Sequence, residues 1–135
     1  ADDGAFLGNR RLSILDLSAD SNQPLFSDDG NLVVVQNGEI YNYIELRDQL
    51  RREGAQFKTT GDTEVVLRAY EIWGPEFVTR LNGMFAIAVY DTAEHCMYFY
   101  RDRLGVKPLF YTGGPQDGHL WFGSEIKTIL ANGNI

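Results

Sequence analysis

The chain contains 135 residues, 44% of them hydrophobic, and carries a formal net charge of −7, a composition that suits one domain with a buried core. The acidic balance argues against nucleic-acid and anionic-membrane partners, which select basic surfaces, and no apolar stretch approaches the roughly 18 residues of a membrane helix. A single cysteine, Cys96, excludes an internal disulfide and has no metal-ligand spacing to His95 or His119, so the sequence predicts no metal site.

The first strand is predicted at residues 8–15, after a turn near the start of the chain. In this strand Arg11 and Ser13 share one face, and Leu12 and Ile14 share the other. On the pattern alone, Arg11 and its neighbour form an ordinary surface pair. A polar connection with a turn at 28–31 follows.

The centre of the sequence is the stretch from residue 32 to residue 42. Its apolar run, Leu32 to Gln36, predicts a strand that is buried on both faces. Asn37-Gly38 comes next, and because a helical pattern rather than a second strand follows it, we expect the pair to close the strand at the rim of a pocket. The Asn37 amide and an unobstructed Gly38 N–H are two donors, which can form an oxyanion hole when aimed at one point. A strand, turn and cap without chemistry is the alternative.

Two helices are predicted next. Asn42, with a glutamate three residues later, predicts the cap of a helix over 43–53, and a short strand is expected at 56–59. The second helix opens at 60–64 and ends at Gly74-Pro75, before a helical turn over 76–81. Local sequence favours Asp62 as the cap of this second helix, and Glu39 as a solvated carboxylate.

The remaining pattern is mostly strands. Residues 84–90 and 96–100 predict a hairpin, and 101–111 predicts a strand, a glycine turn and a further strand. A final strand is expected at 119–123, followed by a helix over 125–131 that Ser124 caps. Buried strands covered by amphipathic helices indicate the α+β class.

The segment Asn37-Gly38-Glu39-Ile40-Tyr41-Asn42 resembles the signature of the glutaminase domain of glutamine-hydrolysing asparagine synthetases. These domains are class II glutamine amidotransferases of the N-terminal-nucleophile hydrolase superfamily. Further blocks resemble the family in its order, at 10–14, 61–64, 82–86, 101–111 and 124–127. The resemblance implies a four-layer αββα sandwich of antiparallel sheets, of which 1–135 is a single, partial amidotransferase domain that lacks the first strand and helix.

The resemblance also implies roles for individual residues. Asn37 and Gly38 would form the oxyanion hole, and Arg11 would bind the α-carboxylate of L-glutamine. Glu39 and Asp62 would accept its α-ammonium group, so that the pocket selects a free amino acid. Family members usually carry histidine at the position of Asn9, which leaves Arg11 in register. Main-chain groups that would line the carboxylate side belong to Leu12, Ser13, Ile14 and Leu15.

The implied reaction is cytoplasmic release of ammonia from glutamine for ATP-dependent amidation of aspartate. The family's nucleophile is a cysteine at the N-terminus, and Ala1 has no nucleophilic atom, so we expect this chain to be inactive alone. No cofactor is expected in it, since ATP and Mg would belong to an absent C-terminal synthetase domain. The alternative is a non-catalytic domain that binds a ligand or supports a neighbouring synthetase domain.

Overall fold

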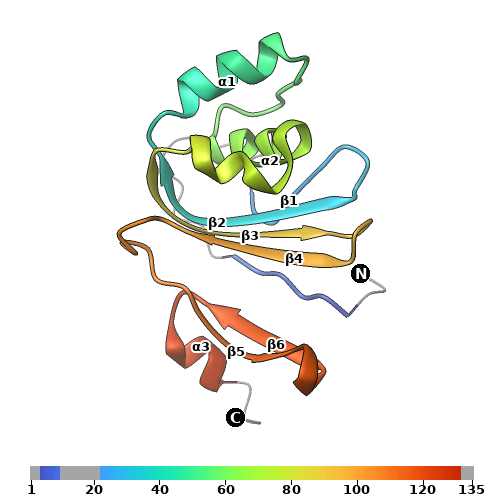
Figure 1. Ribbon diagram of the computed structural model, residues 1–135, viewed down its shortest axis with the longest axis vertical. Helices are drawn as coiled ribbons and strands as arrows, with labels where there is room; N and C mark the ends of the chain where they lie inside the picture. The colour runs from blue at the N-terminus through green and yellow to red at the C-terminus, as the bar shows by residue number, and fades with distance from the viewer. Residues whose placement is uncertain (1–3, 10–21, 132–135) are drawn as a thin grey trace.

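A computed structural model describes residues 4–9 and 22–131, and it arranges helices and strands in layers (Figure 1). One antiparallel sheet has the strand order β1-β2-β3-β4, and β5 and β6 form a second sheet. The helices α1 and α2 cover one side of the larger sheet, while the smaller sheet and α3 lie on its other side (Figure 1). The expected α+β class with antiparallel sheets is confirmed. The strands are β1 (Leu25–Phe26), β2 (Leu32–Ile40), β3 (Gly83–Asp91), β4 (Cys96–Arg101), β5 (Phe110–Gly114) and β6 (His119–Gly123).

The helices follow the predicted amphipathic segments closely. Gly74, with φ of +65°, ends α2 where the Gly74-Pro75 signal predicted its end. None of the helices in the described part of the chain has the length and apolarity of a membrane span. The α-helices are α1 (Tyr43–Arg52), α2 (Asp62–Trp73) and α3 (Ile126–Leu130), and the 3-10 helices are η2 (Gly74–Arg80) and η3 (Pro115–Asp117).

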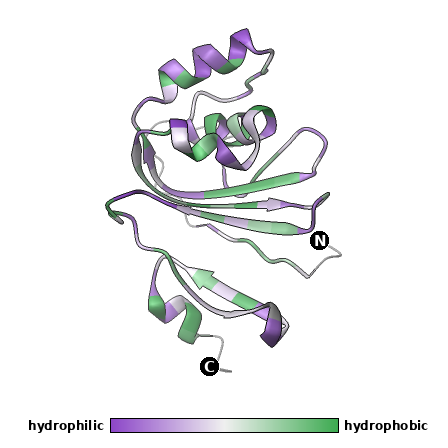
Figure 2. Ribbon diagram, in the orientation of Figure 1, coloured by the Kyte–Doolittle hydropathy of each residue, from purple (hydrophilic) through white to green (hydrophobic). Residues whose placement is uncertain are grey.

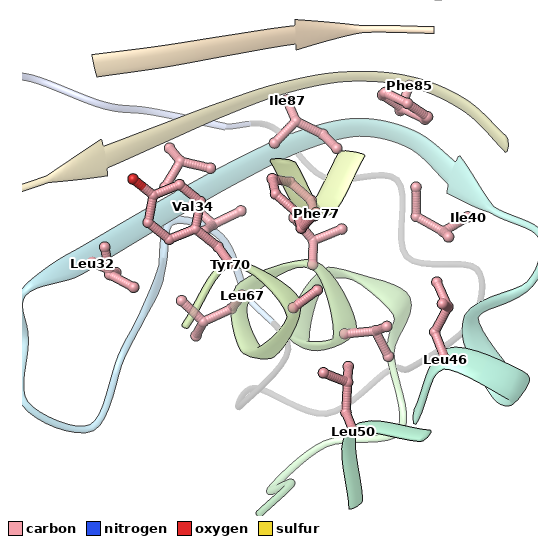
Figure 3. Packing of buried hydrophobic residues seen from close by; sticks show 14 residues of the cluster. Leu32, Val34, Ile40, Leu46, Leu50, Leu67, Tyr70, Phe77, Phe85 and Ile87 are labelled. Atoms are coloured by element: carbon pink, nitrogen blue, oxygen red, sulfur yellow. The ribbon is translucent and has the colours of Figure 1, made fainter. Parts of the chain in front are cut away.

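The main core lies between the larger sheet and its helices. Apolar side chains of β2 and β3 point toward those of α1 and α2 (Figure 3), and these strands and helices contain many of the hydrophobic residues marked along the ribbon (Figure 2). Residues 32–36 of β2 are all buried, which confirms the strand predicted to be covered on both faces. Phe77 of η2 is fully buried and makes edge-to-face contacts with Tyr70 and Tyr100, at centroid distances of 6.0 and 5.0 Å.

The strand predicted between the helices is wrong, and the cap predicted before α1 is confirmed in position alone. Residues 56–59 do not form a strand, because the buried Glu64 carboxylate of α2 accepts the N–H groups of Lys58 (2.9 Å) and Thr59 (2.7 Å). Asn42 is the N-cap residue of α1, as predicted, but its side chain makes no capping bond. Its carboxamide instead accepts from the Asn82 N–H (2.9 Å) and donates to the Arg80 carbonyl (3.0 Å), because the entry to β3 lies beside the start of α1.

The segment after β4 is also different from its prediction. The strand ends at Arg101, and the next one begins only at Phe110, in the other sheet. The buried Asp102 carboxylate organises the crossing between them by accepting N–H groups from both sides. Its donors are the backbone N–H groups of Phe85 (3.1 Å), Leu104 (3.2 Å), Val106 (2.9 Å) and Lys107 (3.0 Å).

Candidate functional site

A cavity of about 1200 Å³ is lined by residues of both sheets and by the start of α2. Four of the predicted site residues line it together: Asn37, Gly38 and Glu39 from β2, and Asp62 from α2. The other five predicted residues lie outside the described residues, so their roles stay predictions. These are Arg11, Leu12, Ser13, Ile14 and Leu15.

Asn37 and Gly38 occupy the middle of the sheet. The prediction that they close the strand is wrong, because β2 continues to Ile40 and pairs Gly38 with Phe85 of β3. Gly38 has φ of +133°, and a Cβ added there would lie 2.0 Å from the Met84 carbonyl oxygen. Only glycine allows this approach between the two backbones, so the strand can pass through a conformation that L-residues rarely adopt.

The Gly38 N–H lies on the edge of β2 that faces away from β3. Phe85 exchanges hydrogen bonds with Asp102, since its N–H reaches Oδ2 (3.1 Å) and its carbonyl accepts the Asp102 N–H (2.8 Å). We therefore infer that Gly38 and Phe85 form a non-hydrogen-bonded pair, in which the Gly38 N–H points to the opposite edge. On that edge the N–H groups of Gln36 and Ile40 are bound by side chains of Gln23 and Asp62.

The Asn37 carboxamide is held by the smaller sheet. Its Nδ2 donates to Oγ of Ser124, which follows β6, at 3.1 Å. Ser124 was predicted to cap α3, but the N-cap residue is Glu125 and no side-chain capping bond forms. A primary amide nitrogen carries two N–H donors. The second Nδ2 hydrogen of Asn37 can thus serve a ligand in the cavity that Asn37 lines.

Asp62 joins α2 to β2. The cap residue of α2 is Gly61, without a side-chain bond, so the capping role that local sequence favoured is wrong. Asp62 is only 7% exposed, and its Oδ2 accepts from the Ile40 N–H (2.9 Å) and from Nε2 of Gln36 (2.8 Å). Its Oδ1 has no hydrogen-bond partner within 4–9 and 22–131, and Asp62 is one of the residues that line the cavity.

Sequence reasoning missed a set of amide side chains around Asp62. Gln23 Oε1 accepts from the Gln36 N–H and from Asn9 Nδ2 (2.8 Å), and its Nε2 donates to Thr63 Oγ1 (3.3 Å). Asn9 also donates to the Gln36 carbonyl (3.0 Å). The signal in the sequence was Gln36 at the end of the apolar run, but this signal alone does not predict which residue Gln36 binds.

The described residues contain no group of three or more His, Cys, Asp or Glu side chains that could hold a metal ion. Cys96 is exposed at the start of β4. The chemistry of the cavity wall is thus that of amide donors and carboxylate acceptors on one strand and the adjoining helix.

Residues 1–135 match the family described as Glutamine amidotransferase domain. The chain is 47% identical over 123 residues to asparagine synthetase (glutamine-hydrolyzing) 2 of Bacillus subtilis, an alignment that covers 91% of this chain and 16% of that protein. It is 44% identical over 131 residues to asparagine synthetase (glutamine-hydrolyzing) 3 of the same organism, covering 95% and 21%. Against asparagine synthetase (glutamine-hydrolyzing) 2 of Oryza sativa the identity is 42% over 124 residues, covering 92% and 20%. The chain thus spans about a fifth of these relatives.

Solved structures agree on the fold. Glutamine phosphoribosylpyrophosphate amidotransferase from B. subtilis, complexed with ADP and GMP, superposes with a TM-score of 0.71 at 23% identity, covering 86% of this chain and 27% of that one. The allosteric regulatory enzyme of purine biosynthesis gives 0.59 at 26% identity, covering 68% and 22%. The first likeness confirms the expected fold of the N-terminal-nucleophile amidotransferases. With the family match over its whole length, this chain belongs to the glutamine amidotransferase domain family.

Proposed function

We propose that this chain binds L-glutamine in the cavity between its sheets and forms the glutaminase part of an asparagine synthetase-like enzyme. The observation that carries the proposal is the meeting of Asn37, Gly38, Glu39 and Asp62 on one cavity wall in a chain of the glutamine amidotransferase domain family. Amide donors and carboxylate acceptors on one wall match the two polar ends that glutamine presents there, its side-chain amide and its ammonium group.

In this proposal, the ammonium group of glutamine binds at Asp62 Oδ1 and beside Glu39. A carboxylate that already accepts two N–H groups on Oδ2 is fixed in orientation, so a charge-assisted bond to its other oxygen costs little further ordering. Arg11 would bind the α-carboxylate as a bidentate fork. That role rests on the family resemblance, as do those of the main-chain groups at 12–15.

The side-chain amide of glutamine would meet Asn37 Nδ2 and the Gly38 N–H. These donors stabilise the negative oxygen that forms when a thiolate attacks the amide carbonyl. The base that took the thiol proton passes it to the amide nitrogen, the C–N bond breaks, and ammonia departs to leave a glutamyl thioester. Water then hydrolyses the thioester to glutamate and restores the thiol. We propose that the thiolate belongs to a cysteine outside these 135 residues, and that a synthetase domain with ATP and Mg uses the ammonia to amidate aspartate.

Titration of L-glutamine into the chain, followed by heat or amide chemical shifts, tests the proposal. Saturable binding is expected, and Asp62→Asn should weaken it strongly because the neutral amide loses the attraction to the ammonium group. Asp48→Asn is the matched control, since Asp48 is exposed on α1 and pairs with Arg51. A folded chain that binds no glutamine would contradict the proposal and favour a non-catalytic domain.

A further inference from the structure

We infer that Gln36 is a positioning residue for Asp62 and makes the cavity selective for ligands with a primary ammonium group. The inference rests on the proposed function, because it assigns to a residue of the same cavity a role in recognising glutamine. Gln36 lines the cavity beside Asp62, and the contact between the two side chains is 2.8 Å from Nε2 to Oδ2.

Gln36 occupies a position that the core would otherwise fill with an apolar side chain. Along β2 it shares a face with Leu32, Val34 and Ile40, which all belong to the main core. Gln36 is 5% exposed, so its carboxamide is buried where an apolar side chain would cost less. A buried polar group at such a position calls for an explanation beyond packing.

The hydrogen bonds of Gln36 show a one-sided arrangement. Its Nε2 donates to Asp62 and to the Gly38 carbonyl (3.3 Å), whereas its Oε1 is buried without a partner. The reverse orientation of the amide would place Oε1 against the Asp62 carboxylate and lose both donations. The bond to Asp62 therefore fixes the orientation of the Gln36 amide and leaves its Oε1 without a hydrogen bond.

Gln23 fixes the backbone at the same point. Its Oε1 accepts the Gln36 N–H, and its Nε2 donates to Thr63, the residue after Asp62. The two glutamines thus connect β2 to the first turn of α2 at Asp62 and at Thr63. Asp62 lines the cavity and its Oδ1 has no partner among residues 4–9 and 22–131, so in this proposal Oδ1 is the acceptor for the ligand, in an orientation that is set before the ligand binds.

Gln36→Met tests the role, because methionine has nearly the same volume and flexibility but no N–H donor. Two ligands are compared by titration: L-glutamine, and glutaramate, which has the same amide and carboxylate but no ammonium group. In the variant the affinity for L-glutamine should fall about tenfold, as one charge-assisted bond is misplaced, while any affinity for glutaramate stays unchanged. Gln49→Met is the matched control, since Gln49 lies on α1 and bonds only Glu53 among the described residues (3.0 Å).

The thermal midpoint and a double-mutant cycle separate positioning from a structural effect. Gln36→Met removes the unpartnered Oε1 together with the bond to Asp62, and because the two effects on stability oppose each other, its midpoint should stay close to that of the unsubstituted chain. In the Asp62→Asn background, Gln36→Met should cause no further loss of glutamine affinity. Additive losses, or equal losses for both ligands, would overturn the inference alone. A folded, unsubstituted chain that binds no L-glutamine would overturn the proposed function and this inference with it.

Discussion

Replacement of Gly38 by alanine should destabilise the chain more than the same replacement at Gly54 or Gly83. An alanine at φ of +133° is strained by about 1–3 kcal/mol. Its Cβ would also lie 2.0 Å from the Met84 carbonyl oxygen and 2.8 Å from Phe85 Cα. Because both neighbours are backbone atoms, β2 and β3 must separate. We expect the weakened hydrogen bonds and packing between the two strands to cost about 2–3 kcal/mol more. The total is about 3–6 kcal/mol, against a typical domain stability of roughly 5–15 kcal/mol.

Two other glycines separate the two contributions. Gly54 has φ of +103° and nothing within 4 Å of an added Cβ, so Gly54→Ala should report the backbone strain alone. Gly83 has no positive φ, but its added Cβ would lie 2.3 Å from the Glu39 carbonyl oxygen, so Gly83→Ala should report the close approach alone. The free energies of unfolding of the three variants are compared by urea denaturation.

We expect Gly38→Ala to lower the free energy of unfolding most. Its loss should be close to the sum of the losses in Gly54→Ala and Gly83→Ala. If Gly38→Ala costs no more than Gly54→Ala, the close approach of β2 and β3 at this point has no energetic weight. The explanation of glycine in the Asn37-Gly38 pair by backbone contact would then be refuted.

Three further outcomes are expected. Phe77→Ala should lower the free energy of unfolding by about 3–5 kcal/mol in urea titrations, because Phe77 is fully buried between aromatic rings. Ser124→Ala should cost about 0.5–1.5 kcal/mol and speed hydrogen exchange of the Asn37 side-chain amide, whereas Ser124→Thr should keep the bond. Backbone N–H groups, first that of Lys107, hold the pKa of Asp102 below its ordinary 3.8. Asp102 thus stabilises the fold above pH 3.8, and this contribution is lost as pH falls through the lower folded pKa. The difference in urea midpoint between the unsubstituted chain and Asp102→Asn should narrow below pH 3.8.

Sequence reasoning predicted the elements that depend on local apolar patterns. The run at 32–36, the hairpin of β3 and β4, and the two longer helices were all expected, since each buries a face whose period can be read in the sequence. It failed where a side chain from elsewhere binds the backbone. Glu64 takes the N–H groups that would make 56–59 a strand, and Asp102 turns the chain out of the first sheet after β4.

For the site, the Asn-Gly pair and the family resemblance identified residues that the fold brings to one cavity. The amides of Gln23 and Gln36 could not be found in this way, because a polar residue in an apolar run has meaning only through its partner. The partner of the Gln36 amide is Asp62, and Gln23 donates to Thr63; both partners are remote in the sequence and close only in the fold. Ser124 was predicted to have a local capping role. Its contact with Asn37 joins the two sheets and could not be predicted from neighbouring residues.

Strand β2 contributes to both the core and the candidate site. Its first half packs in the core, and its second half lines the cavity. From Leu32 to Val35 its side chains are apolar and pack on both faces. From Gln36 to Gly38 the face toward the helices has a buried amide and then no side chain, so this half of the strand contributes little hydrophobic stabilisation. The bonds that Asp62 accepts from Gln36 and Ile40 connect this half of the strand to α2. The same carboxylate therefore connects this part of β2 to α2 and lines the cavity, so a variant at Asp62 must be judged by both stability and ligand binding.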